Sequence, residues 1–425
     1  MIASDWRHMA QLTDDCFAFG GALMPVDAAM RLIADRIMPV AETQEVRLSH
    51  ADGRVVAVDI LSPIALPPFA NSAVDGFAVR HVDLDPDAPT QLPLRGRIAA
   101  GGSTTGLGTR QVAVRVFTGA PLPDDADTVF MQEDAKTTPK HVILPPGLRK
   151  GANLRRAGED VARGAVVLPA GRRMRPQDVA LAAAVGIASL PVRRQLKVAL
   201  FSTGDELVEP GEVLAEGAIY DSNRLLLAAL LQRFGVQVSD LGILRDDRDE
   251  LAGRLEAAAS GHDLILTSGG VSTGEEDHVK AAVESIGKLV FWRLAIKPGR
   301  PVAMGIIEGI PFAGLPGNPV AVFVTFCHVV RPLLARLSGM QLSPLAPLEV
   351  RAAFSYKKKP GRREYVRVSL RISPDGKAEA VKHAQEGAGI LTSLTETHGL
   401  AELAEDVSTI APGDAVGFLP YAMMW

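Results

Sequence analysis

The sequence predicts a multidomain protein, in which an α/β domain with a mainly parallel sheet lies between a β-rich module and a small C-terminal β domain. The chain has 425 residues, which exceeds one compact core and suits three or four domains of roughly 100 to 150 residues each. Short β-branched runs broken by Pro and Gly fill residues 61–150. Apolar strand-like runs then alternate with periodic helices over residues 198–337.

An amphipathic helix is expected first, over residues 25–38, because Ala28, Ile33 and Ile37 fall near one helical face. Asp27 is available to cap this helix.

Strands of the β-rich module are expected next, at residues 112–117 and 142–144 among others. Residues 178–189 return to an Ala-rich helical pattern, which ends at Leu190-Pro191.

The α/β domain follows. Val198–Phe201 and Asp263–Thr267 are continuous apolar runs, as expected for strands that are buried on both faces. Periodic helices are expected at residues 222–234, 276–286 and 319–337.

Beyond Ser338 the pattern changes again. Alternating segments at residues 365–370 and 416–419 predict the C-terminal β domain.

Composition and charge exclude several classes of protein. The hydrophobic fraction of 47% and the charged fraction of 22% are ordinary for a soluble globular protein. The formal charge is −4 without a long block of one sign, so no nucleic-acid partner is expected, and Lys357–Lys359 is expected to be a solvated strand end. No window approaches the roughly 18 uncharged apolar residues of a membrane span. With only Cys16 and Cys327, a reducing cytoplasm is the expected location.

Loops at strand ends carry the candidate chemistry. Residues 266–274 (LTSGGVSTG) end a buried strand in a Gly- and hydroxyl-rich loop, whose bare amides could hold a phosphate. The acids at residues 275–277 would repel that phosphate unless a divalent cation bridges them, so a metal is implied. The alternative is that these acids only stabilise the N-terminus of the next helix.

Two further acidic strand ends point to the same edge of the sheet. Residues 201–206 (FSTGDE) repeat the arrangement, with Glu206 beyond a tight turn. Asp246 follows another apolar run, although surface turn residues would look the same.

Cations and amides complete this edge. In residues 296–301 (IKPGRP), Lys297 and Arg300 flank a Gly-containing turn and suit an oxyanion, although an ordinary exposed turn explains them equally well. Residues 314–319 (GLPGNP) open the long helix with free backbone amides.

In the N-terminal half, residues 71–79 (NSAVDGFAV) place the carboxylate of Asp75 in a small, polar, Gly-containing stretch that is atypical of a mere turn. Residues 117–123 and 155–160 are similar, and each could be an Asx or Pro turn. None of these segments identifies a function alone.

Taken together and in order, eight segments resemble the MoeA family, which includes the E domain of gephyrin. They are NSAVDGFAV, FTGAPLPDDADTVFMQED, NLRRAGED, FSTGDEL, IYDSNR, TSGGVSTGEEDHV, AIKPGRP and GLPGNPVAV. The resemblance runs from about Val26 to the C-terminal domain.

The resemblance implies a homodimeric, cytoplasmic molybdopterin molybdenumtransferase with its active site shared between subunits. Such an enzyme inserts molybdate into adenylylated molybdopterin and cleaves the adenylate with Mg²⁺, yielding molybdenum cofactor and AMP. Molybdopterin adenylyltransferase, molybdoenzymes and their chaperones are the transient partners it implies.

The family resemblance also implies four structural parts. They are a helical, elongated part (residues 1–62 and 153–190), an inserted β-rich domain (63–152), a three-layer α/β domain (191–337) and a β-barrel-like domain (338–425).

The resemblance places the family's catalytic residues on Asp75, Thr118, Asp160, Glu206, Asp246, Asp277 and Lys297. Several carboxylates around one phosphoanhydride make sense only if Mg²⁺ lies among them, and Glu206, Asp246 and Asp277 are its expected ligands. The expected substrate-binding residues are Ser268, Gly269, Gly270, Ser272, Pro298, Arg300, Gly317, Asn318 and Arg367. Molybdate is a tetrahedral dianion, so it requires N–H donors and fixed positive charge, which Arg367 would supply.

The sequence departs from the family pattern at several positions. Ala70 stands where Asp is frequent, Phe77 and His278 where Tyr is frequent, and Arg293 where Lys is frequent. Ala388 replaces a common serine, and Ser393 is the candidate to supply the missing hydroxyl.

Two other functions stay open. The related molybdopterin adenylyltransferase shares the α/β domain but usually carries a Gly-Gly-Thr-Gly type of loop and comes as that domain alone, whereas residues 269–272 are Gly-Gly-Val-Ser. A scaffold such as gephyrin could lose Asp75, Glu206 and Asp277, yet all three are present, which favours an enzyme.

Overall fold

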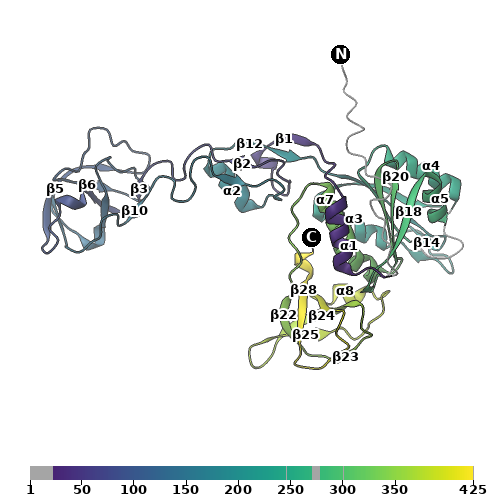
Figure 1. Ribbon diagram of the computed structural model, residues 1–425. Helices are drawn as coiled ribbons and strands as arrows, with labels where there is room; N and C mark the ends of the chain where they lie inside the picture. The colour runs from purple at the N-terminus through teal and green to yellow at the C-terminus, as the bar shows by residue number, and fades with distance from the viewer. Residues whose placement is uncertain (1–22, 246, 270–277, 300, 425) are drawn as a thin grey trace, which may run out of the picture.

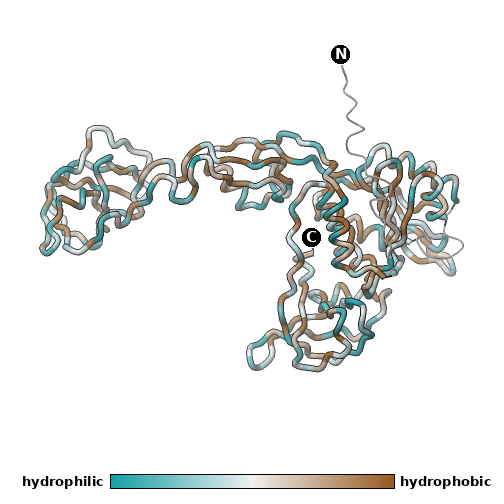
Figure 2. Tube along the Cα trace, in the orientation of Figure 1, coloured by the Kyte–Doolittle hydropathy of each residue, from teal (hydrophilic) through white to brown (hydrophobic). Residues whose placement is uncertain are grey.

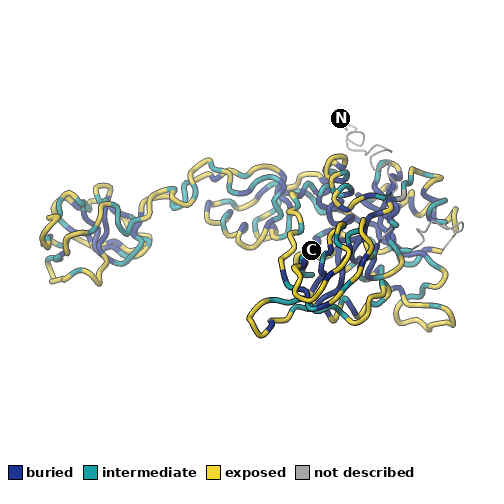
Figure 3. Tube along the Cα trace, turned by 60° about the horizontal axis from the view of Figure 1, so that its bottom comes forward, coloured by how far each residue is buried: buried dark blue, intermediate teal, exposed yellow. Residues whose placement is uncertain are grey.

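The structure is a computed structural model that describes residues 23–245, 247–269, 278–299 and 301–424. The chain forms a long arm that joins a compact body (Figure 1). The β-rich module lies at the free end of the arm, and the α/β and C-terminal domains form the body. Hydrophobic stretches occur in every part of the chain (Figure 2), and the buried residues of the arm and of the body form separate clusters (Figure 3).

The α/β domain has a six-stranded sheet in the order β16-β13-β17-β21-β20-β18. The strands are β13 (Lys197–Thr203), β16 (Gln237–Leu244), β17 (Leu264–Ser268), β18 (Gly287–Arg293), β20 (Pro301–Ile307) and β21 (Ile310–Leu315). The first four in this order are parallel, whereas β20 runs antiparallel to both of its neighbours. The prediction of a mainly parallel sheet is therefore confirmed.

Helices cover both faces of this sheet, because successive residues of a buried strand point to opposite sides. Val198 and Leu200 belong to the cluster that includes residues of α3 (Asn223–Phe234), α6 (Pro319–Thr325) and α7 (Arg331–Leu337). Ala199 and Phe201 belong to the cluster with α4 (Arg248–Ala259) and α5 (His278–Ile286). The three-layer arrangement is confirmed, although α4 was absent from the helices that periodicity predicted.

The helix expected over residues 319–337 contains one irregular turn. A π-helical turn, Phe326–Val330, separates α6 from α7. Pro319–Leu337 is long and apolar enough to cross a membrane, but 94% of its most apolar window is buried inside the protein. Among the described residues it is therefore a core helix.

Two helix ends differ from the prediction. Helix α1 (Val26–Arg36) begins after Pro25 without a side-chain cap, so the expected capping role of Asp27 is wrong. The carboxylate of Asp27 instead accepts hydrogen bonds from both terminal guanidinium nitrogens of Arg363, each at 3.0 Å.

Helix α2 (Pro176–Ala184) also ends before the predicted limit at residue 189. Gly186 has a φ of +84°, and the N–H groups of Gly186 and Ile187 donate to the carbonyls of Ala183 and Ala182. This pairing is the Schellman closure of a helix C-terminus, so residues 189–193 are free to form a strand.

The arm consists of a stalk and the β-rich module at its tip. The stalk is built from three short antiparallel pairs, in which the outgoing and returning chain segments lie side by side. They are β1 (Thr43–Arg47) with β12 (Ser189–Arg193), β2 (Ile60–Leu61) with β11 (Val166–Leu168), and β3 (Asn71–Ser72) with β10 (Leu154–Arg155). At the tip, a sheet has the order β7-β4-β6-β5-β9-β8. Its strands are β4 (Gly76–Val79), β5 (Thr90–Ile98), β6 (Ala113–Val116), β7 (Thr128–Met131), β8 (Lys136–Thr137) and β9 (His141–Leu144).

The C-terminal domain is a closed barrel, because β24 pairs with both β25 and β26 in the order β24-β25-β22-β28-β26. The elements are β22 (Leu348–Ala352), β23 (Tyr356–Lys357), β24 (Arg363–Ile372), β25 (Ala378–Lys382), α8 (Thr392–Thr395), β26 (Gly399–Leu403), β27 (Thr409–Ile410) and β28 (Ala415–Pro420). Strand β19 (Ile296–Lys297) of the α/β domain joins this sheet in parallel with β24, so that Lys297 lies opposite Glu364. The barrel is thus paired directly with the body.

One charged segment of the barrel is less solvated than predicted. Lys357 and Lys359 are exposed, but Lys358 is only 9% exposed. Its ammonium donates to the carbonyls of Ala404 and Val407 at 2.7 and 2.8 Å. The prediction of a solvated strand end is therefore wrong for Lys358, because backbone oxygens replace water around its charge.

Arg224 on α3 connects the core of the body to the segment between β13 and α3. This segment includes β14 (Leu207–Val208) and β15 (Ile219–Tyr220). Arg224 is 3% exposed. Its guanidinium donates to Asp221 at 2.9 Å and to Glu209 at 2.5 Å, and also to Asp240.

We predict that Arg224→Ala lowers the free energy of unfolding by about 3 kcal/mol, because the carboxylate of Asp221, which is 1% exposed, would stay buried without its partner. Chemical denaturation followed by circular dichroism measures this. Arg254→Ala on the exposed side of α4 is the control, with a change expected within about 0.5 kcal/mol. Equal effects of the two substitutions would contradict the prediction.

Candidate active site

A cavity of about 560 Å³ lies between the α/β domain and the barrel. The predicted residues that line it are Glu206, Gly269, Lys297, Pro298, Gly317, Asn318 and Arg367. An adjoining hollow of about 360 Å³ shares Glu206, Gly269, Gly317 and Asn318 and adds Ser268. The fold therefore brings these predicted positions, which are far apart in the sequence, to one place.

Sheet topology explains this convergence. Strands β13, β17 and β21 are parallel neighbours, so the loops that follow them emerge at the same edge. The loop after β17 also needs its first glycine, since Gly269 has a φ of +86° and a Cβ there would lie 2.8 Å from the carbonyl oxygen of Thr203. Asn223 fixes the third loop by donating from its amide to the carbonyl of Gly317 at 2.6 Å.

Lys297 belongs to a triangle of polar groups in the cavity wall. Its ammonium lies 3.1 Å from Oε2 of Glu364 and 3.3 Å from the hydroxyl of Tyr356, which in turn donates to the same Oε2 at 2.9 Å. Burial alone would lower the pKa of Lys297, but the hydrogen bonds from Lys297 to Glu364 and Tyr356 outweigh it and raise that pKa. Lys297 is therefore held as a cation at a fixed position.

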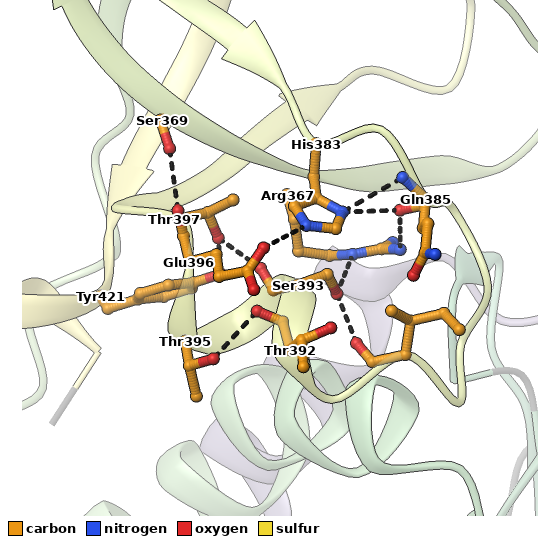
Figure 4. Close-up of polar contacts among 11 residues, drawn as sticks. Arg367, Ser369, His383, Gln385, Thr392, Ser393, Thr395, Glu396, Thr397 and Tyr421 are labelled. Carbon is orange, nitrogen blue, oxygen red and sulfur yellow. Dashed lines mark hydrogen bonds and ion pairs between the residues drawn. The ribbon is translucent and has the colours of Figure 1, made fainter.

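Arg367 also lines the cavity and is 5% exposed. Figure 4 shows its guanidinium between Ser393 and the backbone near Gln385. Nε donates to Oγ of Ser393 at 3.0 Å, and Nη2 donates to the carbonyls of Gln385 and Gly387 at 3.2 Å each. Among the described residues, none accepts a hydrogen bond from Nη1. That nitrogen is available to a ligand.

Ser393 has a different role from the one considered for it. Its side chain is fully buried, and its hydroxyl donates to the carbonyl of Ile390 at 2.6 Å while it accepts from Arg367. The hydroxyl proton is thus committed within the protein, and Ser393 is absent from the cavity wall. Ala388 does line the cavity, so the missing serine there leaves an apolar methyl group.

The remaining predicted residues of the N-terminal half lie on the arm. The carboxylate of Asp75 accepts the N–H and the hydroxyl of Thr118, both at 2.8 Å. These hydrogen bonds lower the pKa of Asp75. Asp160 is exposed near the junction of stalk and module. Within one chain, the module that carries Asp75 and Thr118 lies at the opposite end of the molecule from the cavity (Figure 1).

Five predicted residues lie outside the described part of the chain, namely Asp246, Gly270, Ser272, Asp277 and Arg300. Two of the three predicted magnesium ligands are among them. Within the described residues, no group of three or more His, Cys, Asp or Glu side chains that could hold a metal ion is found.

Comparisons with known proteins match the whole architecture. Residues 24–186 match the MoeA N-terminal region (domain I and II), residues 199–336 a probable molybdopterin binding domain, and residues 349–421 the MoeA C-terminal region (domain IV). The chain belongs to the MoeA family. The predicted resemblance is therefore confirmed.

Relatives cover nearly the full length. The chain is 38% identical to the molybdopterin molybdenumtransferase of Haemophilus influenzae, over 94% of this chain and 99% of that protein. It is 35% identical to molybdopterin molybdenumtransferase 2 of Mycobacterium tuberculosis, over 91% and 97%. The crystal structure of a molybdopterin biosynthesis MoeA protein from Pyrococcus horikoshii OT3 superposes with a TM-score of 0.80 at 32% identity, covering 94% of this chain and all of that one. Like its MoeA relatives, this chain is a molybdopterin molybdenumtransferase.

Sequence reasoning missed the part of this MoeA cavity that the barrel contributes. The unassigned polar residues in its wall are Tyr356, Glu364, Lys382, His383, Gln385 and Glu386. Glu364 and Arg367 both fall in the segment GRREYVR on β24, but they are three residues apart, so strand alternation alone gives no signal that both line the cavity. The cavity also lacks Arg293, which stands at the end of β18 with an exposed side chain.

We predict that Thr118→Val raises the pKa of Asp75 part of the way to its ordinary value, because the hydroxyl donor is lost and the backbone donor stays. A carboxyl-carbon NMR titration of the full chain measures the shift. Thr137→Val on the exposed face of β8 is the matched control and leaves the titration unchanged. An unchanged Asp75 titration in Thr118→Val would show that the hydroxyl contact is not made in solution.

Proposed function

We propose that this cavity binds adenylylated molybdopterin and molybdate, and that molybdenum insertion and adenylate cleavage take place there. The observation that supports this is the convergence of Lys297 and Arg367 with the glycine-containing loops after β17 and β21 in one cavity. Free amides and two fixed cations suit phosphate and oxyanion groups. The product would be molybdenum cofactor, with AMP released.

Arg367 is the proposed molybdate contact. Its guanidinium is fixed on two sides by Ser393 and by the carbonyls of the loop at residues 385–387, which leaves its remaining edge toward the cavity. A preorganised guanidinium loses less freedom on binding a dianion than a mobile one. Lys297, which lines the same cavity, supplies a second positive charge.

Mg²⁺ is the proposed cofactor, held by Glu206 together with Asp246 and Asp277. Glu206 fits this role, since it is an exposed carboxylate that lines both the main cavity and the adjoining hollow. When bound, the ion would neutralise phosphate oxygens and lower the barrier to attack by water.

We further propose a homodimer in which each site uses the arm of the other subunit. In one chain, the β-rich module that carries Asp75 and Thr118 lies at the far end of the arm from the cavity (Figure 1). A two-fold axis places the arm of each subunit over the cavity of the other without any change in the chain's fold.

The cellular setting follows from the proposed reaction. We infer a cytoplasmic enzyme that receives its substrate from a molybdopterin adenylyltransferase and passes its product to molybdoenzymes or their chaperones. The one long apolar helix found among the described residues lies in the core, which agrees with this location.

We also propose that the chain divides into structural parts at residues 62, 152, 190 and 337. The separate hydrophobic clusters of tip, stalk and barrel support this division, although the cluster of the α/β domain also includes residues of α1 and of the barrel.

We predict that Glu206→Ala and Asp277→Ala each reduce Mg²⁺-dependent adenylate cleavage at least about 100-fold, while the melting temperature stays near wild type. AMP release from adenylylated molybdopterin in the presence of molybdate measures the reaction. Glu216→Ala removes an exposed acid that lies outside both hollows and is the control. Near-normal cleavage in either test variant would remove that residue from the proposed metal site.

We predict complementation between two inactive chains. An Asp75→Ala chain mixed with an Asp277→Ala chain gives mixed dimers in which one site carries both lesions and the other carries neither. If random assortment makes about half the dimers mixed, roughly a quarter of wild-type activity returns. Native mass spectrometry confirms the mixed dimers. Activity at background in a sample with confirmed mixed dimers would show that both acids serve the site of one chain.

A further inference from the structure

The triangle of Tyr356, Glu364 and Lys297 holds the Lys297 ammonium in place, but that role does not require the hydrogen bond that Tyr356 also donates to Glu364. Two of its members are a buried carboxylate and a phenol hydroxyl, and a cavity that binds an oxyanion has no need of a negative charge in its wall. Glu364 is only 2% exposed, yet it lines the cavity. All three groups lie within 3.3 Å of one another, and all three line the cavity.

The proposed reaction requires such a group, because it moves protons as well as a metal. When a dithiol takes up molybdate, two Mo–S bonds form, two S–H bonds break and one Mo–O bond breaks. The departing oxygen leaves as water and carries away both thiol protons, so the total charge and the oxidation state of molybdenum are unchanged. An oxo group leaves poorly unless it is protonated, and a thiol reacts poorly unless it loses its proton.

We infer that Tyr356 and Glu364 carry the thiol protons to the departing oxygen, with Lys297 as the fixed cation beside them. This inference rests on the proposed function. The hydroxyl of Tyr356 gives its proton to the oxo group, and Glu364 accepts a proton from a thiol. Glu364 then returns that proton to Tyr356 along their 2.9 Å hydrogen bond. A second transfer along the same path releases water and restores the starting state.

The surroundings of the triangle favour this cycle. Burial, followed by the hydrogen bond to Glu364, raises the pKa of Tyr356, so the phenol keeps its proton until the oxo group takes it. The Lys297 ammonium, 5.8 Å from the centre of the Tyr356 ring, would stabilise the phenolate that forms briefly.

Other charged groups surround the triangle. The ammonium of Lys382 on β25 lies 5.9 Å from the centre of the same Tyr356 ring and is paired with Glu386. Arg367 and Glu206 also line the cavity.

Tyr356→Phe is the central test, since it removes one hydroxyl and keeps the ring. The full-length protein is supplied with adenylylated molybdopterin, Mg²⁺ and molybdate, and cofactor formation is measured by reconstitution of a cofactor-free molybdoenzyme. We expect kcat to fall roughly 100-fold or more, the usual contribution of a general acid. We expect the Kd of molybdate, from calorimetry, to stay within about twofold of wild type, because the proposed oxyanion donors are intact.

Tyr421→Phe is the matched control. The hydroxyl of Tyr421 lies in the same barrel, 2.8 Å from Oγ1 of Thr397, and is absent from the cavity wall. Its substitution leaves kcat within about twofold.

Glu364→Gln separates a proton relay from a structural contact, because the amide keeps the shape and an acceptor but cannot carry the proton. If the two residues act as one unit, the Tyr356→Phe, Glu364→Gln double variant loses no more activity than the worse single variant. Additive losses in the double variant would overturn the relay, as would a molybdate affinity that falls in proportion to kcat.

The two proposals fail in distinguishable ways. An inactive wild-type chain would remove the proposed function and the relay with it. An active wild type whose Tyr356→Phe variant is equally active would remove the relay alone.

Discussion

The pairing of β19 with β24 is the contact on which the cavity depends. It is short, with Ile296 opposite Arg363 and Lys297 opposite Glu364, but it joins the sheet of the barrel to the segment between β18 and β20 of the α/β domain. Backbone pairing fixes position along a strand to one residue, since a slip of one residue would turn every side chain to the other face. The register therefore decides that Lys297 meets Glu364 in the wall of the cavity.

A second set of contacts holds the same junction from outside. Arg363, the neighbour of Glu364 on β24, turns away from the cavity and pairs with Asp27 on α1 and with Glu405 at 3.1 Å. Helix α1 packs in turn on the core of the α/β domain, to which Ile33 and Ile37 contribute. Helix α1, the first helix among the described residues, thus holds the barrel against the α/β domain. Adjacent residues of β24 serve the site and this junction by facing opposite ways.

The sequence was most informative where local pattern and burial agree. Val198–Phe201 reads as a strand covered on both faces, and its alternate residues do divide between two helical layers. The loops after the predicted strands could also be placed together, because neighbouring parallel strands end at the same edge of a sheet. Sequence pattern did not indicate that Gly186 would end α2 early, because an Ala-rich run favours a longer helix and a single glycine is a weak local signal.

The barrel side of the site could not be predicted from local pattern. Glu364 looks like any surface acid until β24 is paired with β19, since that pairing joins segments of different domains. Lys358 and Ser393 show the same limit, because their polar groups are satisfied by carbonyls and a guanidinium that only the folded chain brings near. Resemblance to the MoeA family indicated which positions belong to the site, whereas the hydrogen-bond partners of each side chain could be seen only in the folded structure.

The two-stranded construction of the arm has a mechanical consequence. The pairs β1–β12 and β2–β11 pack with α2 around a hydrophobic cluster, whereas β3 and β10, next to the tip module, form a two-stranded antiparallel pair. A two-stranded pair twists and bends more easily than a packed sheet. The tip module has hydrophobic clusters of its own, so bending of the stalk would move the module as a rigid body. A few degrees of rotation at this pair translate into a displacement of the module that grows with the distance from the pair. The compliance of this pair, rather than any side chain, then sets how far the carboxylate of Asp75 can travel without cost to the folded cores.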